Sequence, residues 1–500
     1  MRAKLVAPLL LAVIARANAL PNILYILADD MNAELGAFGG PAVTPHLDKL
    51  AATGLAFPRA FCQISVCSPS RQSFLTGRRP DTHGVWNFID ANPLNTSAAP
   101  GYFRDAGGYL SLGLGKTFHE AAGAWNAAQY WNTTFLPYFP YATNVCPHGG
   151  EGGGHCTLPD EAIWDAHLLN ASLSYLDAAV AHAKETGAPF FLMTGFRDPH
   201  APWAAPPRMA ALYDEALVAP AAHPTLGAGT PLIAWSEQLA VMLENGTTFP
   251  FGPYAPVPAW VARDQRHAYM AAISYVDEHV GALVARLEAA GVANDTIVVF
   301  HADHGYATGQ HGYWEKKANF DAIVRVPLII KVPAKAATAA GKKAATFLDL
   351  VDVFPTLAAL AGLPPPRGVD GEDLSAAFDA PGAALKGAAF HQYPACGMAA
   401  LNQTRGECNN TPRAQFDFMG YSIRTAQWRY TQWLAWDGAA LAPLWDGAFE
   451  EELYAHAGDD GTSLEAWENE NAAAANPAVA AQLRAQLRAF FQPKGAAARV

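Results

Sequence analysis

The sequence predicts an α/β protein: a large, mixed, mostly parallel sheet flanked by helices, followed by a smaller C-terminal α+β domain with an antiparallel sheet. Apolar runs that end in polar or glycine-containing sequence recur through the first two thirds of the 500 residues, as is typical of strands buried on both faces. A helical pattern separates two of these runs, and strands that alternate with helices indicate an α/β sheet. After about residue 412 the pattern changes to aromatic and β-branched segments and a terminal helix.

The predicted strands begin with residues 22–28, a mostly apolar run that ends directly before Asp29 and Asp30. Because ligands of such sheets bind at the carboxyl ends of the strands, polar residues found there are candidates for one common site. One polar cluster is expected of any loop, whereas four clusters at strand ends favour a shared function. The further runs are 109–115, 189–195, 296–300 and 326–332, and the clusters are Asp29 with Asp30, Lys116 to His119, Asp198 to His200, and Asp303 with His304.

A helix is predicted between two of these apolar runs, 189–195 and 296–300. Its apolar residues recur at steps of three and four, and Gly291 follows as a stop. Near the C-terminus, residues 422–433 have a strand-like composition and residues 477–491 a helical pattern. We therefore predict a main domain over 20–412, which carries the site, and a smaller subdomain over 413–500. The apolar helix positions are Tyr269, Ile273, Val276, Val280, Leu283 and Leu287.

Composition excludes two classes of protein. With 51% hydrophobic and 16% charged residues the chain can bury large cores, which excludes wholesale disorder. The 33 basic and 45 acidic side chains give a net charge of -12 without any basic stretch. Binding to nucleic acid requires clustered Lys and Arg, so no nucleic-acid partner is expected.

The N-terminus predicts a cleaved signal peptide over residues 1–19. Arg2 and Lys4 precede the apolar run 5–14, and 17–19 offer the small-x-small pattern of a cleavage site. The apolar run is too short to span a bilayer, so no stable membrane anchor is expected. Seven sequons also favour the secretory pathway, with a secreted or lysosome- or vacuole-like destination. They begin at Asn95, Asn132, Asn170, Asn245, Asn294, Asn402 and Asn409.

Six cysteines suggest two disulfides in this oxidising route. Cys146 and Cys156 bracket a glycine-rich loop, and Cys396 and Cys408 bracket a polar one, so a bridge in each pair would staple a segment without regular structure. Free thiols are the alternative. Cys62 and Cys67 remain without an obvious partner.

The most specific string in the chain is Cys67-Ser-Pro-Ser-Arg71, which continues through Gly77. It resembles the C-x-P-x-R signature of the sulfatase family, in which the formylglycine-generating enzyme oxidises the cysteine to formylglycine. Residues 108–119, Gly-Tyr-Leu-Ser-Leu-Gly-Leu-Gly-Lys-Thr-Phe-His, resemble the second signature of that family. The resemblance implies an alkaline-phosphatase-like fold and the hydrolysis of sulfate esters.

The chemistry of a sulfate ester agrees with the residues present. The ester is anionic and must release an alkoxide, so hydrolysis requires cations around the sulfonate group. Asp29, Asp30 and Asp303 supply oxygen ligands that suit Ca²⁺, with Cys67 as formylglycine and His304 completing the set. Imidazole is a less typical ligand of Ca²⁺, and Mg²⁺ or Mn²⁺ is the alternative. An unmodified thiol would match such a hard cation poorly.

The resemblance also implies roles for individual side chains. One hydroxyl of the hydrated formylglycine, stabilised by Arg71, attacks sulfur, and loss of the proton from the second hydroxyl then expels sulfate. Lys116 binds an oxygen and His119 is the base of the second step. His200 protonates the leaving alcohol and Lys316 contacts the sulfate group.

The resemblance also implies the substrate, an O-sulfated carbohydrate, with a 2-O-sulfo uronic acid of a glycosaminoglycan or similar polysaccharide as the specific candidate. Loops 92–99 and 138–155 are expected to set this specificity. Two alternatives stay open: a phosphonate or phosphate ester hydrolase of the same superfamily, and a protein that binds sulfated glycans without catalysis if Cys67 stays unmodified.

Overall fold

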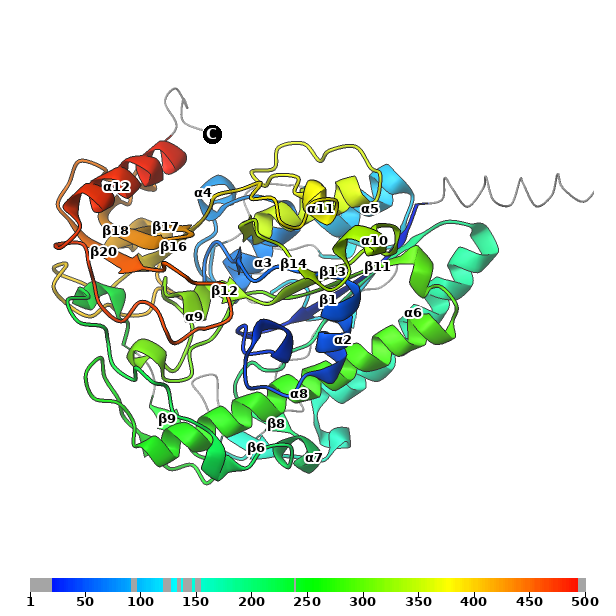
Figure 1. Cartoon of the computed structure of the whole chain (residues 1–500), viewed down its shortest axis with the longest axis horizontal. Coiled ribbons are helices and arrows are strands. Elements are labelled where there is room, and N and C mark those ends of the chain that lie inside the picture. Colours follow the sequence, from blue (N-terminus) through cyan, green and yellow to red (C-terminus); the bar gives the residue numbers. More distant parts are fainter. Residues whose placement is uncertain are drawn as a thin grey trace, which may run out of the picture.

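An eight-stranded sheet forms the centre of the molecule (Figure 1). The inner strands pair in parallel, and the antiparallel pairs both involve β13, so the sheet is mixed and mostly parallel as predicted. The strand order is β14 (Lys342–Lys343), β2 (Leu55–Ala56), β13 (Leu328–Lys331), β11 (Thr296–Ala302), β1 (Asn22–Ala28), β7 (Phe190–Gly195), β4 (Leu110–Gly115) and β5 (Leu136–Pro137).

The computed structural model describes residues 20–90, 97–119, 127–132, 136–137, 146–148, 154–237 and 240–492. The predicted signal peptide, the sequon at Asn95 and most of the loops 92–99 and 138–155 lie outside these ranges. Within them, no helix has both the length and the apolar character needed to cross a membrane.

Four of the five predicted strands match β1, β4, β7 and β11. The fifth, 326–332, is divided by Pro327, which has no N–H to donate to a sheet. Its first part is β12 (Arg325–Val326), which pairs with β3 (Ala60–Phe61) in a small sheet that also contains β15 (Leu348–Asp349). Its second part is β13, which runs antiparallel to β11.

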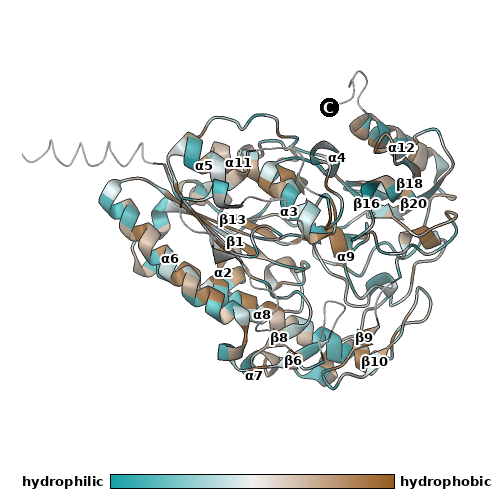
Figure 2. Ribbon diagram, turned by 180° about the vertical axis from the view of Figure 1, so that it is seen from behind, coloured by the Kyte–Doolittle hydropathy of each residue, from teal (hydrophilic) through white to brown (hydrophobic). Residues whose placement is uncertain are grey.

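Helices cover both faces of the central sheet (Figure 1). The predicted helix is α8 (Ala259–Ala289), and Gly291 follows it with a φ of 73°, a conformation that glycine adopts without strain. Both α6 (Trp164–Thr186) and α8 carry hydrophilic and hydrophobic segments along their length (Figure 2). They lie with α2 (Pro45–Thr53) on one face, and the other face is covered by α3 (Cys67–Thr76), α5 (Ala99–Gly107) and α11 (Val353–Leu360).

The C-terminal part forms an antiparallel sheet with its own apolar core, as predicted. The predicted terminal helix is α12 (Pro477–Phe491). The first strand of this sheet, 388–395, precedes the predicted domain boundary between residues 412 and 413. That boundary stays a prediction. The strands are β16 (Ala388–Ala395), β17 (Phe418–Thr425), β18 (Trp428–Asp437), β19 (Ala442–Pro443) and β20 (Phe449–Ala455).

Several short elements connect these layers. They are α4 (Pro80–His83), β6 (His155–Thr157), β8 (Trp203–Ala205), α7 (Pro207–Ala210), β9 (Val241–Met242), β10 (Thr248–Phe249), α9 (Asp321–Val324) and α10 (Ala336–Ala339).

Both predicted disulfides are present, Cys146–Cys156 and Cys396–Cys408, and the remaining two cysteines are free and buried. Asn409, which begins one of the predicted sequons, is 8% exposed, and its Nδ2 donates to Glu407. Glycosylation at the sequons stays a prediction. The sequons that are exposed begin at Asn132, Asn170, Asn245, Asn294 and Asn402.

Candidate active site

The four polar clusters predicted at strand ends meet at one edge of the central sheet. Asp29 and Asp30 follow β1, whose neighbours in the sheet are β11 and β7, and β4 lies beside β7. Parallel pairing brings the carboxyl ends of these strands together. The residues that follow the strands, Lys116 after β4, His200 after β7, and Asp303 with His304 after β11, therefore surround the end of β1.

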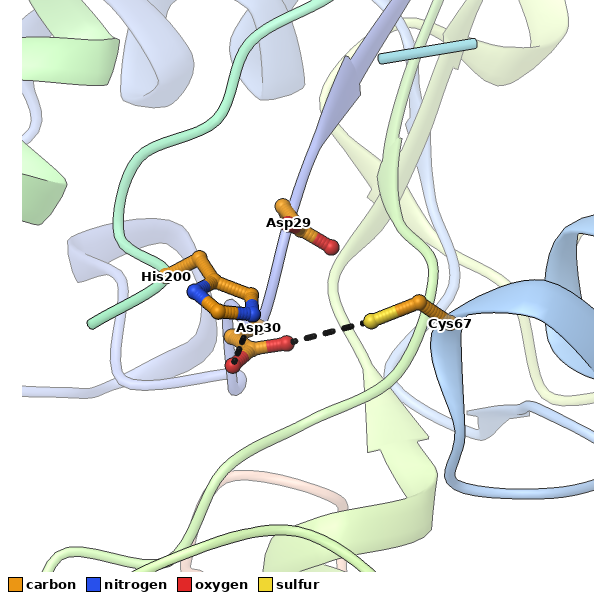
Figure 3. Close-up of side chains that lie close together, drawn as sticks. All are labelled: Asp29, Asp30, Cys67 and His200. Atoms are coloured by element: carbon orange, nitrogen blue, oxygen red, sulfur yellow. Dashed lines mark hydrogen bonds and ion pairs between the residues drawn. The ribbon is translucent and has the colours of Figure 1, made fainter. Parts of the chain in front are cut away.

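Cys67 enters this site from the first turn of α3 (Figure 3). Its Sγ lies 3.9 Å from Asp30 Oδ1. The helix is anchored because the Ser70 hydroxyl donates to the main-chain carbonyl of Asp303. Arg71, one turn after Cys67, projects into the same site because residues four apart share a helix face.

Asp29, Cys67, Asp303 and His304 form a buried group whose potential ligand atoms all lie within 4.8 Å of one another. Asp30 is adjacent, and it has a φ of 61°, which is uncommon for a residue other than glycine. Its N–H donates to Asp303 Oδ1 at 3.1 Å, so the two acidic segments are connected. Carboxylates, one imidazole and the atom at position 67 are donors that fit a divalent cation.

The orientation of His304 supports this assignment. Its Nδ1 lies 3.0 Å from the carbonyl of Gly305, and a carbonyl only accepts, so Nδ1 donates a hydrogen bond to it. Nε2 faces the cluster and lies 3.5 Å from both Asp30 Oδ1 and Asp303 Oδ2 and 3.4 Å from Cys67 Sγ. A backbone carbonyl that fixes the ring in this way is typical of histidines that bind metals.

Three cations surround the acidic residues. Arg71 is fully buried and donates from Nη2 to Asp29 Oδ1 at 2.9 Å and from Nε to Asp303 Oδ2 at 3.0 Å. Lys116 forms an ion pair with Asp29. Lys316 Nζ lies 2.7 Å from Asp30 Oδ1 and 3.1 Å from Cys67 Sγ. These three cations offset the negative charge of Asp29, Asp30 and Asp303.

These pairs control which acids are ionised. Burial opposes ionisation of Asp29, but Lys116 and Arg71 outweigh burial and hold its pKa well below the usual value. At Asp30, His200 and Lys316 likewise outweigh burial and lower the pKa to about 2. Both side chains are therefore carboxylates at any physiological pH.

The thiol of Cys67 and the imidazoles of His200 and His119 are uncharged, in contrast to the ionised Asp29 and Asp30. Burial, together with the charge of neighbouring Asp29, raises the pKa of Cys67 to about 12, so an unmodified Cys67 is a protonated thiol. Burial also holds the pKa of His200 and of His119 well below the usual value. Both rings are therefore neutral in the protein without substrate.

His200 and His119 follow the neighbouring strands β7 and β4. His200 Nδ1 is 2.7 Å from the carbonyl of Ala201, so this nitrogen carries the proton, and Nε2 faces Asp30 Oδ2 at 3.9 Å (Figure 3). The ring of His119 stacks on that of Phe88, with centroids 4.8 Å apart and an interplanar angle of 5°.

Two residues that fix the backbone of the site were not identified as such from the sequence. The guanidinium of Arg197 donates to the carbonyls of His200, Ala201 and Pro202 and so fixes the turn that carries His200. Arg197 lies beside the polar cluster after β7, which was a usable signal. Tyr269 donates from its hydroxyl to the carbonyl of Asp30, but helical periodicity marked it only as an apolar position.

Comparison with known proteins agrees with this geometry. The family model named Sulfatase matches residues 21–363, more than half of the chain. The chain belongs to the sulfatase family. The iduronate 2-sulfatases of Mus musculus and Homo sapiens are each 32% identical to it, over 87% of this chain and 88% of each relative. This sulfatase is therefore a sulfuric ester hydrolase.

Solved structures share the fold of this sulfatase at lower identity. The phosphonate monoester hydrolase from Silicibacter pomeroyi has a TM-score of 0.70 and 20% identity, over 94% of this chain and 96% of that one. BT1596, a 2-O GAG sulfatase, has a TM-score of 0.66 and 18% identity, over 94% and 92%. At such identities the likeness establishes a shared arrangement of sheet and helices and no more.

Proposed function

We propose that this sulfatase removes sulfate from an O-sulfated carbohydrate, with formylglycine formed from Cys67 as the nucleophile and a calcium ion held beside it. The observation that carries the proposal is the position of Cys67 Sγ. It lies within 4.8 Å of the ligand atoms of two carboxylates and an imidazole, and 3.1 Å from Lys316 Nζ. A nucleophile at this position is next to both a cation site and a charge that binds sulfate.

The proposed metal ligands are Asp29, Asp30, Asp303 and His304, together with an oxygen of the modified residue 67. Three carboxylates favour Ca²⁺, and Mg²⁺ or Mn²⁺ is the alternative. When bound, the ion would polarise a sulfonate oxygen and favour ionisation of the nucleophilic hydroxyl. Arg71 holds two of these carboxylates in place before any ion arrives, because it bonds to Asp29 and Asp303 together.

The raised pKa of the Cys67 thiol favours formylglycine, rather than the thiol itself, as the nucleophile. A thiol whose pKa is about 12 has almost no thiolate at neutral pH, so the unmodified side chain is a weak nucleophile. Formylglycine, when hydrated, supplies a hydroxyl nucleophile and a second hydroxyl through which the group is regenerated. The proposal therefore requires a formylglycine-generating enzyme as a partner during maturation.

The remaining side chains have roles in binding and proton transfer. Lys116 and Lys316 both approach Cys67, with Nζ at 3.9 and 3.1 Å from Sγ, and we assign them to the sulfate oxygens. His200 is neutral at rest, and an anionic ester beside it favours the protonated ring, which could then donate to the leaving alcohol from Nε2. His119 is the proposed base of the second step.

The proposed substrate is a 2-O-sulfo uronic acid of a glycosaminoglycan or a similar polysaccharide. Similarity to two iduronate 2-sulfatases over 87% of the chain supports it, and a 2-O GAG sulfatase shares the fold. The signal-peptide pattern and the exposed sequons support passage through the secretory pathway to the outside or to a lysosome- or vacuole-like compartment.

The test has two parts. Mass spectrometry of the peptide that contains residue 67 should show the aldehyde; a thiol throughout, with retained binding of sulfated glycan, would favour a non-catalytic binder. Rates with 4-nitrophenyl sulfate and 4-nitrophenyl phosphate should favour the sulfate ester, and a faster phosphate reaction would favour the phosphoryl alternative. A panel of sulfated disaccharides should then show preference for the 2-O-sulfo uronic acid over 6-O-sulfo glucosamine.

A further inference from the structure

The loop closed by the Cys396–Cys408 disulfide, residues 396–408, lies against the active site although it belongs to the C-terminal sheet. It leaves the end of β16, and the N–H of Met398 donates to Asp417 Oδ2 at 2.9 Å. The disulfide closes it, and the N–H of Gly406 donates to the carbonyl of Cys396 at 2.8 Å. We call residues 396–408 the disulfide loop.

Arg405 connects the disulfide loop to the segment that carries Lys316. The side chain is fully buried, and Nη2 donates to the carbonyl of Lys317 and, at 3.2 Å, to the hydroxyl of Tyr313. Nε donates to the carbonyl of Ile233 at 3.1 Å. The guanidinium therefore fixes the backbone directly after Lys316.

That backbone is strained. Lys317 has a φ of 77°, in the left-handed region that residues with a side chain rarely adopt. Such a conformation persists only when its surroundings enforce it. Here the carbonyl is held by Arg405, and the buried Nζ is paired with Glu315 and, at 2.6 Å, with Glu407 of the disulfide loop.

The other side of the same segment is held close to Cys67. The N–H of Ala318 donates to Ser65 Oγ at 3.1 Å, and that hydroxyl is 2.9 Å from the Ala318 carbonyl. The turn at 316–318 is thus fixed between the residues before Cys67 and the disulfide loop. Its shape directs Lys316 Nζ towards Asp30 and Cys67.

The residue that follows the disulfide loop also supports the part of the site that carries His119. Asn409 follows the loop directly; its carbonyl accepts from the N–H of Phe88 at 3.0 Å, and its Nδ2 donates to Glu407 Oε2 at 3.2 Å. Phe88 is the ring on which His119 stacks. One short segment therefore contacts the supports of both Lys316 and His119.

We propose that the disulfide loop is a positioning element of the active site. Glu407 and Arg405 enforce the turn that aims Lys316, and Asn409 holds Phe88 against His119. The proposal rests on the proposed function for what Lys316 and His119 do. The residues of the loop do not touch the reacting atoms, and they act on the rate through the two side chains they support.

Glu407→Gln is the decisive variant because its carboxylate is 38% exposed and its loss should not unfold the protein. Glu451→Gln is the matched control: Glu451 is 27% exposed and pairs with Arg484 in the C-terminal sheet. We expect Glu407→Gln to lower kcat and to weaken binding of inorganic sulfate about tenfold each, since a small displacement of a binding group has effects of this size. Glu407→Asp should recover part of both losses.

The unfolding temperature of both Gln variants should stay within about 2 °C of wild type. A merely structural role would lower it and leave sulfate affinity unchanged. The binding measurement, by calorimetry on the full chain, does not depend on turnover. Sulfate affinity and kcat of Glu407→Gln equal to those of Glu451→Gln would overturn the positioning role alone, whereas an inactive wild type with the aldehyde at residue 67 would overturn the proposed function.

The disulfide itself is tested by the double variant Cys396→Ser, Cys408→Ser. Opening the loop removes the constraint on Glu407, so sulfate affinity should fall at least as far as in Glu407→Gln while the far-UV circular dichroism is retained. Wild-type sulfate affinity in this folded variant would show that the bridge has no part in aiming Lys316.

Discussion

Replacing Arg71 with Met should destabilise the cation-free protein far more than the loss of one ion pair at the surface. Arg71, Asp29 and Asp303 are all fully buried, and the guanidinium bonds to both carboxylates. Removing one partner of a buried pair costs about 3–5 kcal/mol because a charge is left uncompensated. Asp29 keeps Lys116, so most of the loss falls on Asp303, and about 4 kcal/mol is expected.

The measurement is urea unfolding followed by the fluorescence of the 13 tryptophans, in chelator and again in excess Ca²⁺. A bound cation replaces part of the missing charge, so the difference between Arg71→Met and wild type should shrink when Ca²⁺ is added. The control is Arg484→Met, which breaks a pair exposed by 34% and 27% and should cost less than about 1 kcal/mol. Equal losses of unfolding free energy for the two variants in chelator would refute the conclusion that Arg71 compensates the buried charges of Asp29 and Asp303.

Three further predictions concern the nucleophile, the metal and acid stability. Cys67→Ala should abolish turnover of 4-nitrophenyl sulfate without changing the circular dichroism, and near-wild-type turnover would reject residue 67 as the nucleophile. Chelation should lower both the rate and the unfolding temperature. Adding Ca²⁺ at about 100 times its Kd should raise the free energy of unfolding by about 2.7 kcal/mol. A free energy of unfolding that does not change with chelator would contradict the cation site. His456 and Arg325 lower the folded pKa of Asp459 from 3.8 to about 2 despite burial, so its stabilising effect is present above pH 4 and lost as pH falls towards 2. Urea midpoints measured across that range should therefore fall in wild type and stay flatter in Asp459→Asn.

The central part of the site was predictable because it depends on strand ends. Asp29, Lys116, His200 and Asp303 each follow a buried apolar run, and parallel pairing necessarily gathers such positions. The limits of the strands follow from the same hydrophobicity. The failure at 326–332 has a local cause, since Pro327 interrupts a run that hydrophobicity alone presents as continuous.

The supports of the site were not predictable in the same way. Arg197 bonds to three carbonyls through its side chain, and its place beside the polar cluster after β7 does not reveal which groups it contacts. Arg405 and Glu407 lie about 90 residues after the Lys317 they contact, in a loop that sequence reasoning assigned only a stapling disulfide. Long-range side-chain contacts of this kind are set by packing between the two sheets, and local patterns do not encode them.

The balance of buried charge explains how a chain of net charge -12 can act on an anionic ester. The carboxylates of the site are matched by Arg71, Lys116 and Lys316, so the protein alone brings the cluster close to neutrality. A divalent cation at the proposed site would leave an excess of two positive charges, enough for the ester and an ionised nucleophile. Because these charges are buried, screening by salt is weak and attraction acts inside the site rather than over the whole surface. The acidic exterior and the anionic substrate are therefore compatible.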